Sequence, residues 1–421
     1  MSQQIRAVTG TRDILPDEAP LWQRMEQTAR SLLGRYGYRE LRTPIFEETG
    51  LFARGIGSET DIVSKEMYTF EDRDEGRTSL TLRPEATAGM VRAVIEHNLF
   101  QSDPALRVFA LGPMFRREKP QKGRYRQFHQ VDVEAFGVTR PSIDAEIVEL
   151  GMGYLEACGL TGLELVLNSV GDASDRPAYV EVLRQALRPL ASRMCPDCQR
   201  RSESNPLRVL DCKVPEDQPA LEALPRIADH LSPESREHFE EVQRELRLLG
   251  IPFRVSHRLV RGLDYYTRTT FEIVSGGLGA QNTVLGGGRY DGLVQELGGP
   301  AVCGIGFALG MERLALLMPA VEGERRCDVY LAPLAAAGFD RALLVQRDLR
   351  AADLSVLMDH EGKSFKARMK QADKLGARLT LILGDSELQK GVWAVRDMAR
   401  SEQSEVAEER LLDHVKEKLH G

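Results

Sequence analysis

The sequence predicts a mixed α and β fold in two parts, a large sheet-containing domain with a helical insert and a small C-terminal α/β domain. Three observations lead to this prediction. Strand-like segments fill much of residues 39–137, whereas residues 172–255 are charged and helical, with no strand signal until their end. After residue 326 strands and helices alternate, which is typical of an α/β domain with a mostly parallel sheet. We therefore expect domains at residues 1–325, with the insert at about 172–255, and at residues 326–421.

The first domain begins with an amphipathic helix and a strand at the edge of a sheet. Residues 17–36 carry apolar side chains at helical spacing, namely Leu21, Met25, Ala29, Leu32, Leu33 and Tyr36. Residues 39–46 have strand character, but Pro44 interrupts them, and this places the strand at an edge or a bulge. A helix over residues 142–158 and a short strand over residues 163–168 are expected to follow.

Bulk composition restricts the class of protein. The 421 residues carry a net charge of −7, so a nucleic-acid partner would have to meet local basic patches. No apolar run is long enough to span a bilayer, and Met1–Ile14 lacks a signal-peptide core. We expect a cytoplasmic protein without a membrane partner. The six cysteines do not suggest a disulfide framework in that compartment.

The most informative segment is a basic loop between two predicted strands. Residues 116–126 carry six basic side chains against the single acid Glu118, and Pro120 and Gly123 mark the segment as a loop. Guanidinium groups bind phosphate oxygens in pairs, so a dense arginine loop suits a polyphosphate ligand. The alternative is a solvated charged hairpin.

The strand after this loop favours the binding site over the solvated hairpin. Its period of two places one set of side chains on a polar, aromatic-edged face: Phe128, Gln130, Asp132, Glu134 and Phe136. The opposite face is mainly apolar and takes His129, Val131, Val133 and Ala135. One face can therefore meet a core while the other lines a cavity.

Four further segments combine glycine or a helix start with polar groups. Residues 80–87 deliver Glu85 and a hydroxyl at the start of a helix, and residues 261–267 crowd a cation, an acid and two phenols together. Residues 286–292 are expected to form a backbone-exposing loop, and residues 304–313 a glycine-rich strand that leads into a helix. Turn chemistry or ordinary packing could explain each segment alone, but together they favour a functional site.

A possible metal site is incomplete in the sequence. Cys195 and Cys198 have the spacing of a zinc half-site, and Cys212 lies downstream, but a fourth ligand is not evident. The sequence therefore argues against zinc, and we predict no protein metal site.

These segments together resemble the histidyl-tRNA synthetases of bacterial type, which are class II aminoacyl-tRNA synthetases, over the whole chain. Residues 37–57 resemble the class motif at the dimer interface, residues 115–134 the second class motif and residues 304–313 the third. Residues 261–266 and 287–291 resemble the two histidine-site motifs of this family. The departures are minor: Ala86 stands where the family usually has glycine, and the strand near residues 391–393 is less regular.

The resemblance implies an α+β catalytic domain with an antiparallel sheet, an inserted helical subdomain and a C-terminal α/β anticodon-binding domain. It implies that L-histidine and ATP give histidyl-adenylate, and that the histidyl group passes to the 3′ end of tRNA(His). ATP would enter with Mg²⁺ as a substrate complex, and no tightly bound cofactor is expected. The predicted edge strand has to be covered, so we expect a homodimer through residues 17–57.

The same resemblance implies roles for single residues. Arg116 would hold the α-phosphate, Arg124 and Arg313 the distal phosphates, and Phe128 would stack on adenine. Arg261 would add a second cation at the α-phosphate, where relatives use a magnesium ion. Arg116 and Arg261 are the expected catalytic residues, and both would also contact histidine.

A polar pocket would select the amino acid. Imidazole offers one hydrogen-bond donor and one acceptor, which Glu134 and Tyr266 can match. The α-amino end would be held by Glu85, Thr87 and Gln130, and the pocket would be closed by Tyr265 and Tyr290.

In the last domain a lysine stripe is the expected tRNA contact. Lys363, Lys366, Lys370 and Lys374 recur at helical spacing, and Phe365, Met369 and Ala372 can face the sheet. We predict that Lys366 and Lys370 bind tRNA, against the alternative of a solvated surface helix.

Two other classes of protein compete with the enzyme. One is a non-catalytic paralogue such as the regulatory subunit of ATP phosphoribosyltransferase, which shares the fold but typically lacks the last domain and the arginines. The other is an RNA-binding or amino-acid-sensing module. Arg116, Arg261 and Arg313 are all present, as is a full C-terminal domain, and both features favour the enzyme.

Overall fold

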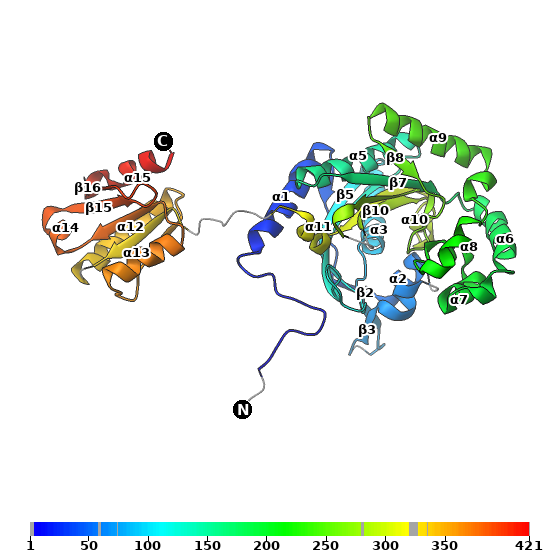
Figure 1. The fold of residues 1–421 in the computed structure, drawn as a ribbon, viewed down its shortest axis with the longest axis horizontal. Coiled ribbons are helices and arrows are strands. Elements are labelled where there is room, and N and C mark those ends of the chain that lie inside the picture. The colour runs from blue at the N-terminus through cyan, green and yellow to red at the C-terminus, as the bar shows by residue number, and fades with distance from the viewer. Residues whose placement is uncertain are drawn as a thin grey trace. The chain divides into compact units, whose positions relative to one another are not determined.

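The computed structural model describes residues 4–57, 60–73, 75–278, 282–319, 327–334 and 336–420. The chain divides into two compact units, residues 1–320 and 321–421 (Figure 1). The predicted boundary between residues 325 and 326 lies outside the described residues. Within the described part of the chain, no helix combines the length and the apolar character needed to cross a membrane.

An eight-stranded sheet forms the centre of the larger unit. Its strand order is β1-β5-β6-β11-β10-β9-β7-β8. Only the outermost pairs, β1 with β5 and β7 with β8, are parallel, so the predicted antiparallel sheet is confirmed. The strands are β1 (Arg39–Glu40), β5 (Arg107–Phe115), β6 (Gln127–Phe136), β7 (Leu163–Ser169), β8 (Phe253–Val255), β9 (Thr267–Ser275), β10 (Thr283–Tyr290) and β11 (Gly304–Gly310).

Helices cover the apolar face of this sheet. They are α1 (Ala19–Arg35), α5 (Pro141–Ala157), α9 (Pro233–Leu248) and α11 (Met311–Leu317). Val131 and Val133 of β6 are buried in one apolar cluster with residues of all four helices, as the period of two in this strand predicts. Fully burying a valine or leucine side chain contributes about 1.5–3 kcal/mol, so this layer fixes which face of β6 remains for a cavity.

The segment between β7 and β8 is helical, but its helices pack in two different places. Its first part contains α6 (Asp175–Leu187), α7 (Pro196–Ser204) and α8 (Gln218–Glu222), joined by short 3₁₀ turns. The last helix, α9, instead packs beside α5 through Phe239, Val242 and Leu246 (Figure 1). The helical segment therefore ends in the layer that covers the main sheet.

A second, three-stranded sheet has the order β2-β4-β3, with β2 (Phe46–Glu48), β3 (Tyr68–Glu71) and β4 (Ser79–Leu82). The single strand predicted over residues 39–46 is wrong. Residues 39–40 pair with β5 in the large sheet, whereas residue 46 begins a strand of the small one. Pro44 lies between them, since it lacks the N–H that a continuous ladder needs. The neighbouring helices are α2 (Thr49–Ile56), one π-helical turn (Ile62–Glu66), α3 (Thr87–Glu96), α4 (Leu99–Ser102) and α10 (Leu293–Glu296).

The smaller unit has a mixed sheet of order β13-β12-β14-β15-β16. The predicted alternation of strands and helices is confirmed, but the sheet is parallel only from β13 to β14, because β15 and β16 pair antiparallel. The elements are β12 (Val329–Pro333), α12 (Phe339–Ala351), β13 (Val356–Met358), α13 (Phe365–Lys374), β14 (Leu379–Leu383), α14 (Asp385–Lys390), β15 (Val392–Asp397), β16 (Gln403–Ala407) and α15 (Leu411–His420).

Candidate active site

A cavity of about 840 Å³ lies against the polar face of the large sheet. It is lined by every site residue predicted in the catalytic domain: Glu85, Thr87, Arg116, Arg124, Phe128, Gln130, Glu134, Arg261, Tyr265, Tyr266, Tyr290 and Arg313. These residues come from segments up to about 230 positions apart, and the fold gathers them at one site.

Glu134 of β6 is held by two hydroxyl groups. Thr87 donates a hydrogen bond of 2.7 Å to Oε1, and the Tyr290 hydroxyl donates to Oε2. Burial raises the pKa of this carboxyl to about 8. Gly306 of β11 makes room for it, since a Cβ atom at that position would overlap Oε2.

The three tyrosines form one wall of the cavity. The Tyr265 ring lies 4.7 Å from the Tyr266 ring and 5.5 Å from the Tyr290 ring, measured between centroids. The sequence paired Glu134 with Tyr266. In the structure Tyr290 makes the contact with Glu134, while the Tyr266 ring lies 5.7 Å from the Arg261 guanidinium.

Glu85 caps the helix that follows it. Its two carboxylate oxygens accept backbone hydrogen bonds of 2.9 Å from Thr87 and Ala88, at the start of α3. Each oxygen keeps a second lone pair, so the carboxylate is fixed in place and can still accept a bond from a ligand.

Sequence reasoning did not assign a role to Asp132, which lies between Gln130 and Glu134 on the same face of β6. Its side chain is fully buried, and neither carboxylate oxygen has a hydrogen-bond partner among the described residues. Burial, reinforced by the charges of Glu134 and Glu85, raises its pKa well above the ordinary value. The alternation along β6 was the available signal, because it places Asp132 on the cavity face.

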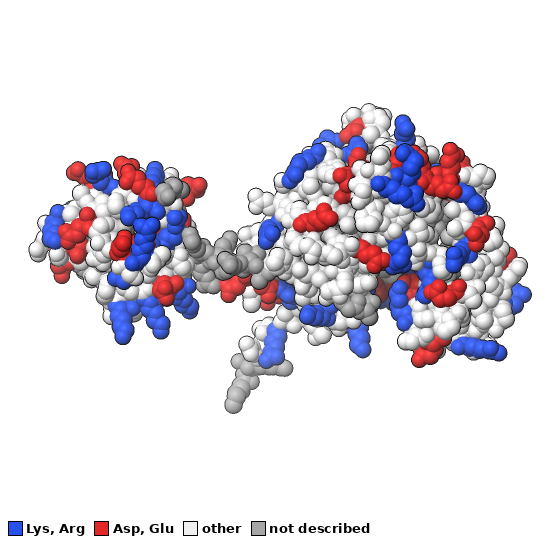
Figure 2. Space-filling view, turned by 45° about the horizontal axis from the view of Figure 1, so that its top comes forward, with Lys and Arg blue, Asp and Glu red and all other residues white. Residues whose placement is uncertain are grey.

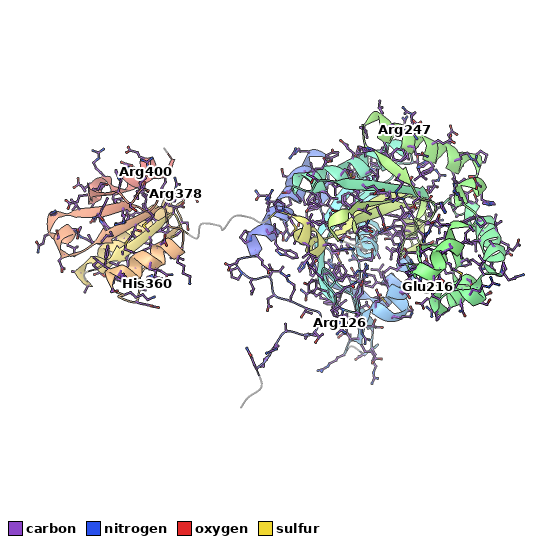
Figure 3. The ribbon with its side chains drawn as sticks, in the orientation of Figure 1. Arg126, Glu216, Arg247, His360, Arg378 and Arg400 are labelled. Carbon is purple, nitrogen blue, oxygen red and sulfur yellow. The ribbon has the colours of Figure 1, made fainter. Side chains whose placement is uncertain are left out.

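The basic loop supplies the opposite end of the cavity. Arg116 donates a 2.8 Å hydrogen bond to the Pro84 carbonyl, and its guanidinium lies 5.3 Å from the Phe128 ring centroid. Glu118 lies between two arginines, 3.9 Å from Arg116 and 3.0 Å from Arg124. Figure 3 marks Arg126, the last residue of the loop.

Arg313 completes this end of the cavity. Burial and, after it, the positive charge of Arg124 lower the pKa of Arg313. An anionic ligand beside Arg313 and Arg124 would offset both the burial of the guanidinium and the repulsion between the two cations.

Arg261 is held by a carboxylate that the sequence did not reveal. Its Nη1 lies 2.5 Å from Glu272 Oε1 of β9, and Thr283 donates a 2.8 Å bond to the other oxygen. The prediction of a loop at residues 286–292 is wrong, since residues 286–290 lie in β10. The glycines serve packing, because a Cβ at Gly288 would lie 2.8 Å from the Tyr266 ring.

The lysines predicted to contact tRNA lie on α13 of the smaller unit. Lys366 and Lys370 are exposed. The expectation that Phe365 faces the sheet is wrong, since its side chain is 45% exposed. Arg368 takes the inner position and pairs with Asp359 at 2.7 Å. On the face that Figure 2 shows, this unit carries both basic and acidic side chains.

Comparison with known proteins decides the family. A model of the family described as histidyl-tRNA synthetase matches residues 10–314, and one described as anticodon binding domain matches residues 328–418. The chain belongs to the histidyl-tRNA synthetase family. A histidine–tRNA ligase of Solibacter usitatus is 53% identical, over 97% of this chain and 98% of the relative. One of Koribacter versatilis is 50% identical, over 99% of this chain and 97% of the relative.

The fold alone would not separate a synthetase from a protein whose title names a regulatory subunit. The structure of apo S. aureus histidyl-tRNA synthetase is 38% identical with a TM-score of 0.82, covering 98% of this chain and 100% of that one. A Bacillus halodurans structure titled ATP phosphoribosyltransferase regulatory subunit/histidyl-tRNA synthetase has a TM-score of 0.66 at 19% identity, covering 91% and 99%. The full-length identity to curated ligases confirms the predicted enzyme class, an ATP-dependent aminoacyl-tRNA synthetase, over the paralogue.

Proposed function

We propose that this cavity activates L-histidine with ATP and that the histidyl group is then transferred to the 3′ end of tRNA(His). One observation carries the proposal: a buried pocket of carboxylates and phenols opens into an arginine-lined region of the same cavity. An amino acid and a nucleotide can therefore meet in one cavity.

Glu134 would recognise the imidazole ring of histidine. Held by Thr87 and Tyr290, it presents an acceptor to a ring N–H, and a neighbouring phenol can serve the second ring nitrogen. Analogues that lack either ring nitrogen would leave these buried groups unpaired, which can discriminate by ~10⁴-fold or more. Gln130 and the carboxylates of Asp132 and Glu85 would receive the α-ammonium group.

The arginines would act on the phosphates. Adenylate formation is an attack of the histidine carboxylate on the α-phosphate, and it develops negative charge that fixed cations stabilise. Arg116 and Arg261 would hold the α-phosphate, Arg124 and Arg313 the distal phosphates, and Phe128 would stack on adenine. Arg261 would exchange part of its contact with Glu272 for the phosphate in this step.

ATP would enter with Mg²⁺ as a substrate complex. The cavity carboxylates Glu118 and Glu312 lie among the arginines and offer the oxygen ligands that this ion prefers. Glu312 is oriented by His129, whose backbone N–H lies 3.0 Å from both carboxylate oxygens.

A homodimer would cover the small sheet. The strand registers place five apolar side chains on one face of that sheet, and none of them is buried: Phe46, Tyr68, Phe70, Leu80 and Leu82. Phe46 is 53% exposed and Phe70 is 46% exposed. A contiguous apolar face of this kind marks an interaction surface, and it lies partly within the predicted interface at residues 17–57.

Lys366 and Lys370 would contact tRNA on the smaller unit, and the enzyme would work in the cytoplasm. No described carboxylate lies within ion-pair distance of either lysine, so both charges can meet RNA phosphates.

Histidine-dependent ATP–pyrophosphate exchange tests the proposed reaction. We expect exchange that requires L-histidine and is not supported by the other amino acids. If the protein binds histidine but catalyses no exchange, it is a sensing module and the proposed activity is wrong.

A further inference from the structure

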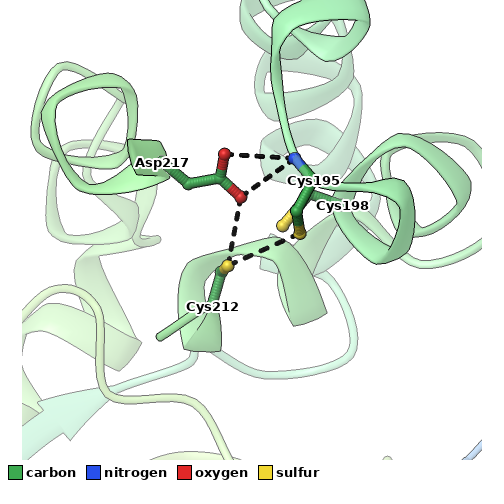
Figure 4. A group of neighbouring side chains, drawn as sticks. All are labelled: Cys195, Cys198, Cys212 and Asp217. Carbon is green, nitrogen blue, oxygen red and sulfur yellow. Dashed lines mark hydrogen bonds between the residues drawn. The ribbon is translucent and has the colours of Figure 1, made fainter. Parts of the chain in front are cut away.

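Three cysteines and one aspartate converge in the helical segment (Figure 4). Cys195 and Cys198 lie at the start of α7, Cys212 follows the next 3₁₀ turn, and Asp217 precedes α8. One potential ligand atom from each residue lies within 4.8 Å of all the others. The sequence argued against a metal site because it showed no fourth ligand, and the fold supplies Asp217.

Two of the distances between these atoms are close to those around a tetrahedral zinc ion. Two thiolates that each lie about 2.3 Å from tetrahedral zinc are roughly 3.8 Å apart, and a thiolate and a carboxylate oxygen are roughly 3.6 Å apart. The Sγ atoms of Cys195 and Cys212 are 3.9 Å apart, and Cys212 Sγ lies 3.2 Å from Asp217 Oδ2. An ion could therefore enter with shifts of only a few tenths of an ångström at these atoms.

The four side chains are largely shielded from solvent, and backbone hydrogen bonds orient them. Cys198, Cys212 and Asp217 are buried, and Cys195 is half-buried. The Val214 N–H lies 3.4 Å from Cys212 Sγ, and the Cys195 N–H donates to Asp217 at 3.1 Å. Such hydrogen bonds orient metal ligands. Asp217 also accepts a 3.2 Å bond from the Cys212 thiol, so its carboxylate is held in place beside the cysteines.

We propose that Cys195, Cys198, Cys212 and Asp217 bind one structural Zn²⁺ ion. Three sulfur ligands and one oxygen favour zinc over magnesium or calcium, which prefer oxygen alone. Four protein ligands fill the tetrahedral coordination and leave no position for a substrate, so the ion would have a structural role.

This ion would brace the segment that supports Arg261. The Cys212 carbonyl accepts bonds from Gln218 at 3.0 Å and from Arg258 at 3.3 Å. In the turn before it, Arg208 donates a 2.8 Å bond to the backbone carbonyl of Arg261. Zinc would thus join α7 to the turn that fixes Arg261, a cavity residue.

Metal analysis of the untagged wild-type chain, purified from zinc-replete cells, tests the proposal without relying on activity. We expect one zinc per chain. Replacement by Co²⁺ should give thiolate-to-cobalt charge-transfer bands and the intense visible bands of tetrahedral cobalt. Zinc far below one per chain together with no such cobalt spectrum would overturn the proposal, as would a Cys195–Cys212 disulfide in the intact protein.

Two variants and a control locate the ion. Cys198→Ser should lose the zinc, whereas Cys303→Ser, which changes a half-buried cysteine outside the cluster, should retain it. Asp217→Asn keeps the volume and an oxygen for the Cys195 N–H, so it should fold. We expect it to bind zinc roughly tenfold or more weakly in competition with a chelator. Wild-type zinc content and affinity in both cluster variants would place the metal elsewhere.

Discussion

Replacing Glu134 with glutamine should stabilise the free enzyme above about pH 5 while weakening its binding of histidine. Glutamine has the volume of glutamate and, like the protonated carboxyl, offers both a donor and an acceptor. The Thr87 and Tyr290 hydroxyls can rotate to accept or donate, so Glu134→Gln should keep the contacts of the wild-type pocket. What the substitution removes is the ability of this side chain to ionise.

The magnitude follows from the raised pKa. Burial lifts the pKa of Glu134 from 4.5 to about 8, so between these values the folded state binds more protons than the unfolded state. The free energy of unfolding of the wild type must therefore fall as pH rises through that window. At about 1.4 kcal/mol for each pH unit, the free energy of unfolding lost by pH 8 is on the order of 5 kcal/mol. Glu134→Gln lacks this loss, so the two proteins should have similar stability near pH 4.5 and should differ by several kcal/mol at pH 8.

Urea unfolding followed by tryptophan fluorescence at a series of pH values measures this difference. The larger unit contains Trp22 and the smaller unit Trp393, and the smaller unit's transition serves as an internal control. Histidine KM should rise roughly 10- to 100-fold, since a hydrogen bond to a charged group contributes about 1.5–3 kcal/mol. If Glu134→Gln is less stable than the wild type at every pH, the carboxylate is a structural group and the reasoning is wrong.

Four further predictions concern separate parts of the protein. Arg261→Ala should nearly abolish pyrophosphate exchange while leaving histidine affinity within several-fold, because its charge acts mainly on the transition state; near-normal exchange would refute its assignment. Asp132→Asn should raise the KM for histidine at least several-fold without lowering stability at pH 8, and an unchanged KM would exclude a role for its carboxylate in substrate binding. Changing Lys366 and Lys370 together to glutamate should raise the KM for tRNA and flatten the salt dependence of binding, with tRNA-independent exchange unchanged. Phe46→Glu should convert a dimer into a monomer in sedimentation experiments.

Matched controls separate these effects from general damage. Lys390 and Lys418, exposed on other helices of the smaller unit, changed together to glutamate make the same charge change and should leave tRNA KM near the wild type. Leu249→Glu changes a side chain that is 48% exposed, close to the value for Phe46, and should leave the oligomeric state unaltered. If changing the control lysines raises the KM for tRNA as much as changing Lys366 and Lys370, the loss of tRNA binding reflects net charge. If wild-type protein sediments as a monomer at micromolar concentration, the small sheet does not mediate a dimer.

The sequence by itself identified the family and the cavity residues, because the relevant signals are local. The period of two on β6 placed Gln130 and Glu134 on one face, and the structure confirms that both line the cavity. The density of arginines between Arg116 and Arg126 similarly indicated a site for phosphates. Such patterns depend on neighbouring residues in a strand or a loop, and backbone geometry fixes these relations before any packing occurs.

Only the tertiary structure decided which partners those side chains have. It paired Arg261 with Glu272 and brought Asp217 to within 4.8 Å of three cysteines. It also showed that Arg289, within a histidine-site motif, is 1% exposed and ion-paired with Asp144, which His238 contacts at 2.9 Å. These partners lie between 5 and 145 positions apart and come from different elements. Their contacts depend on how helices and strands pack around a shared core, and no pattern of adjacent residues records that arrangement.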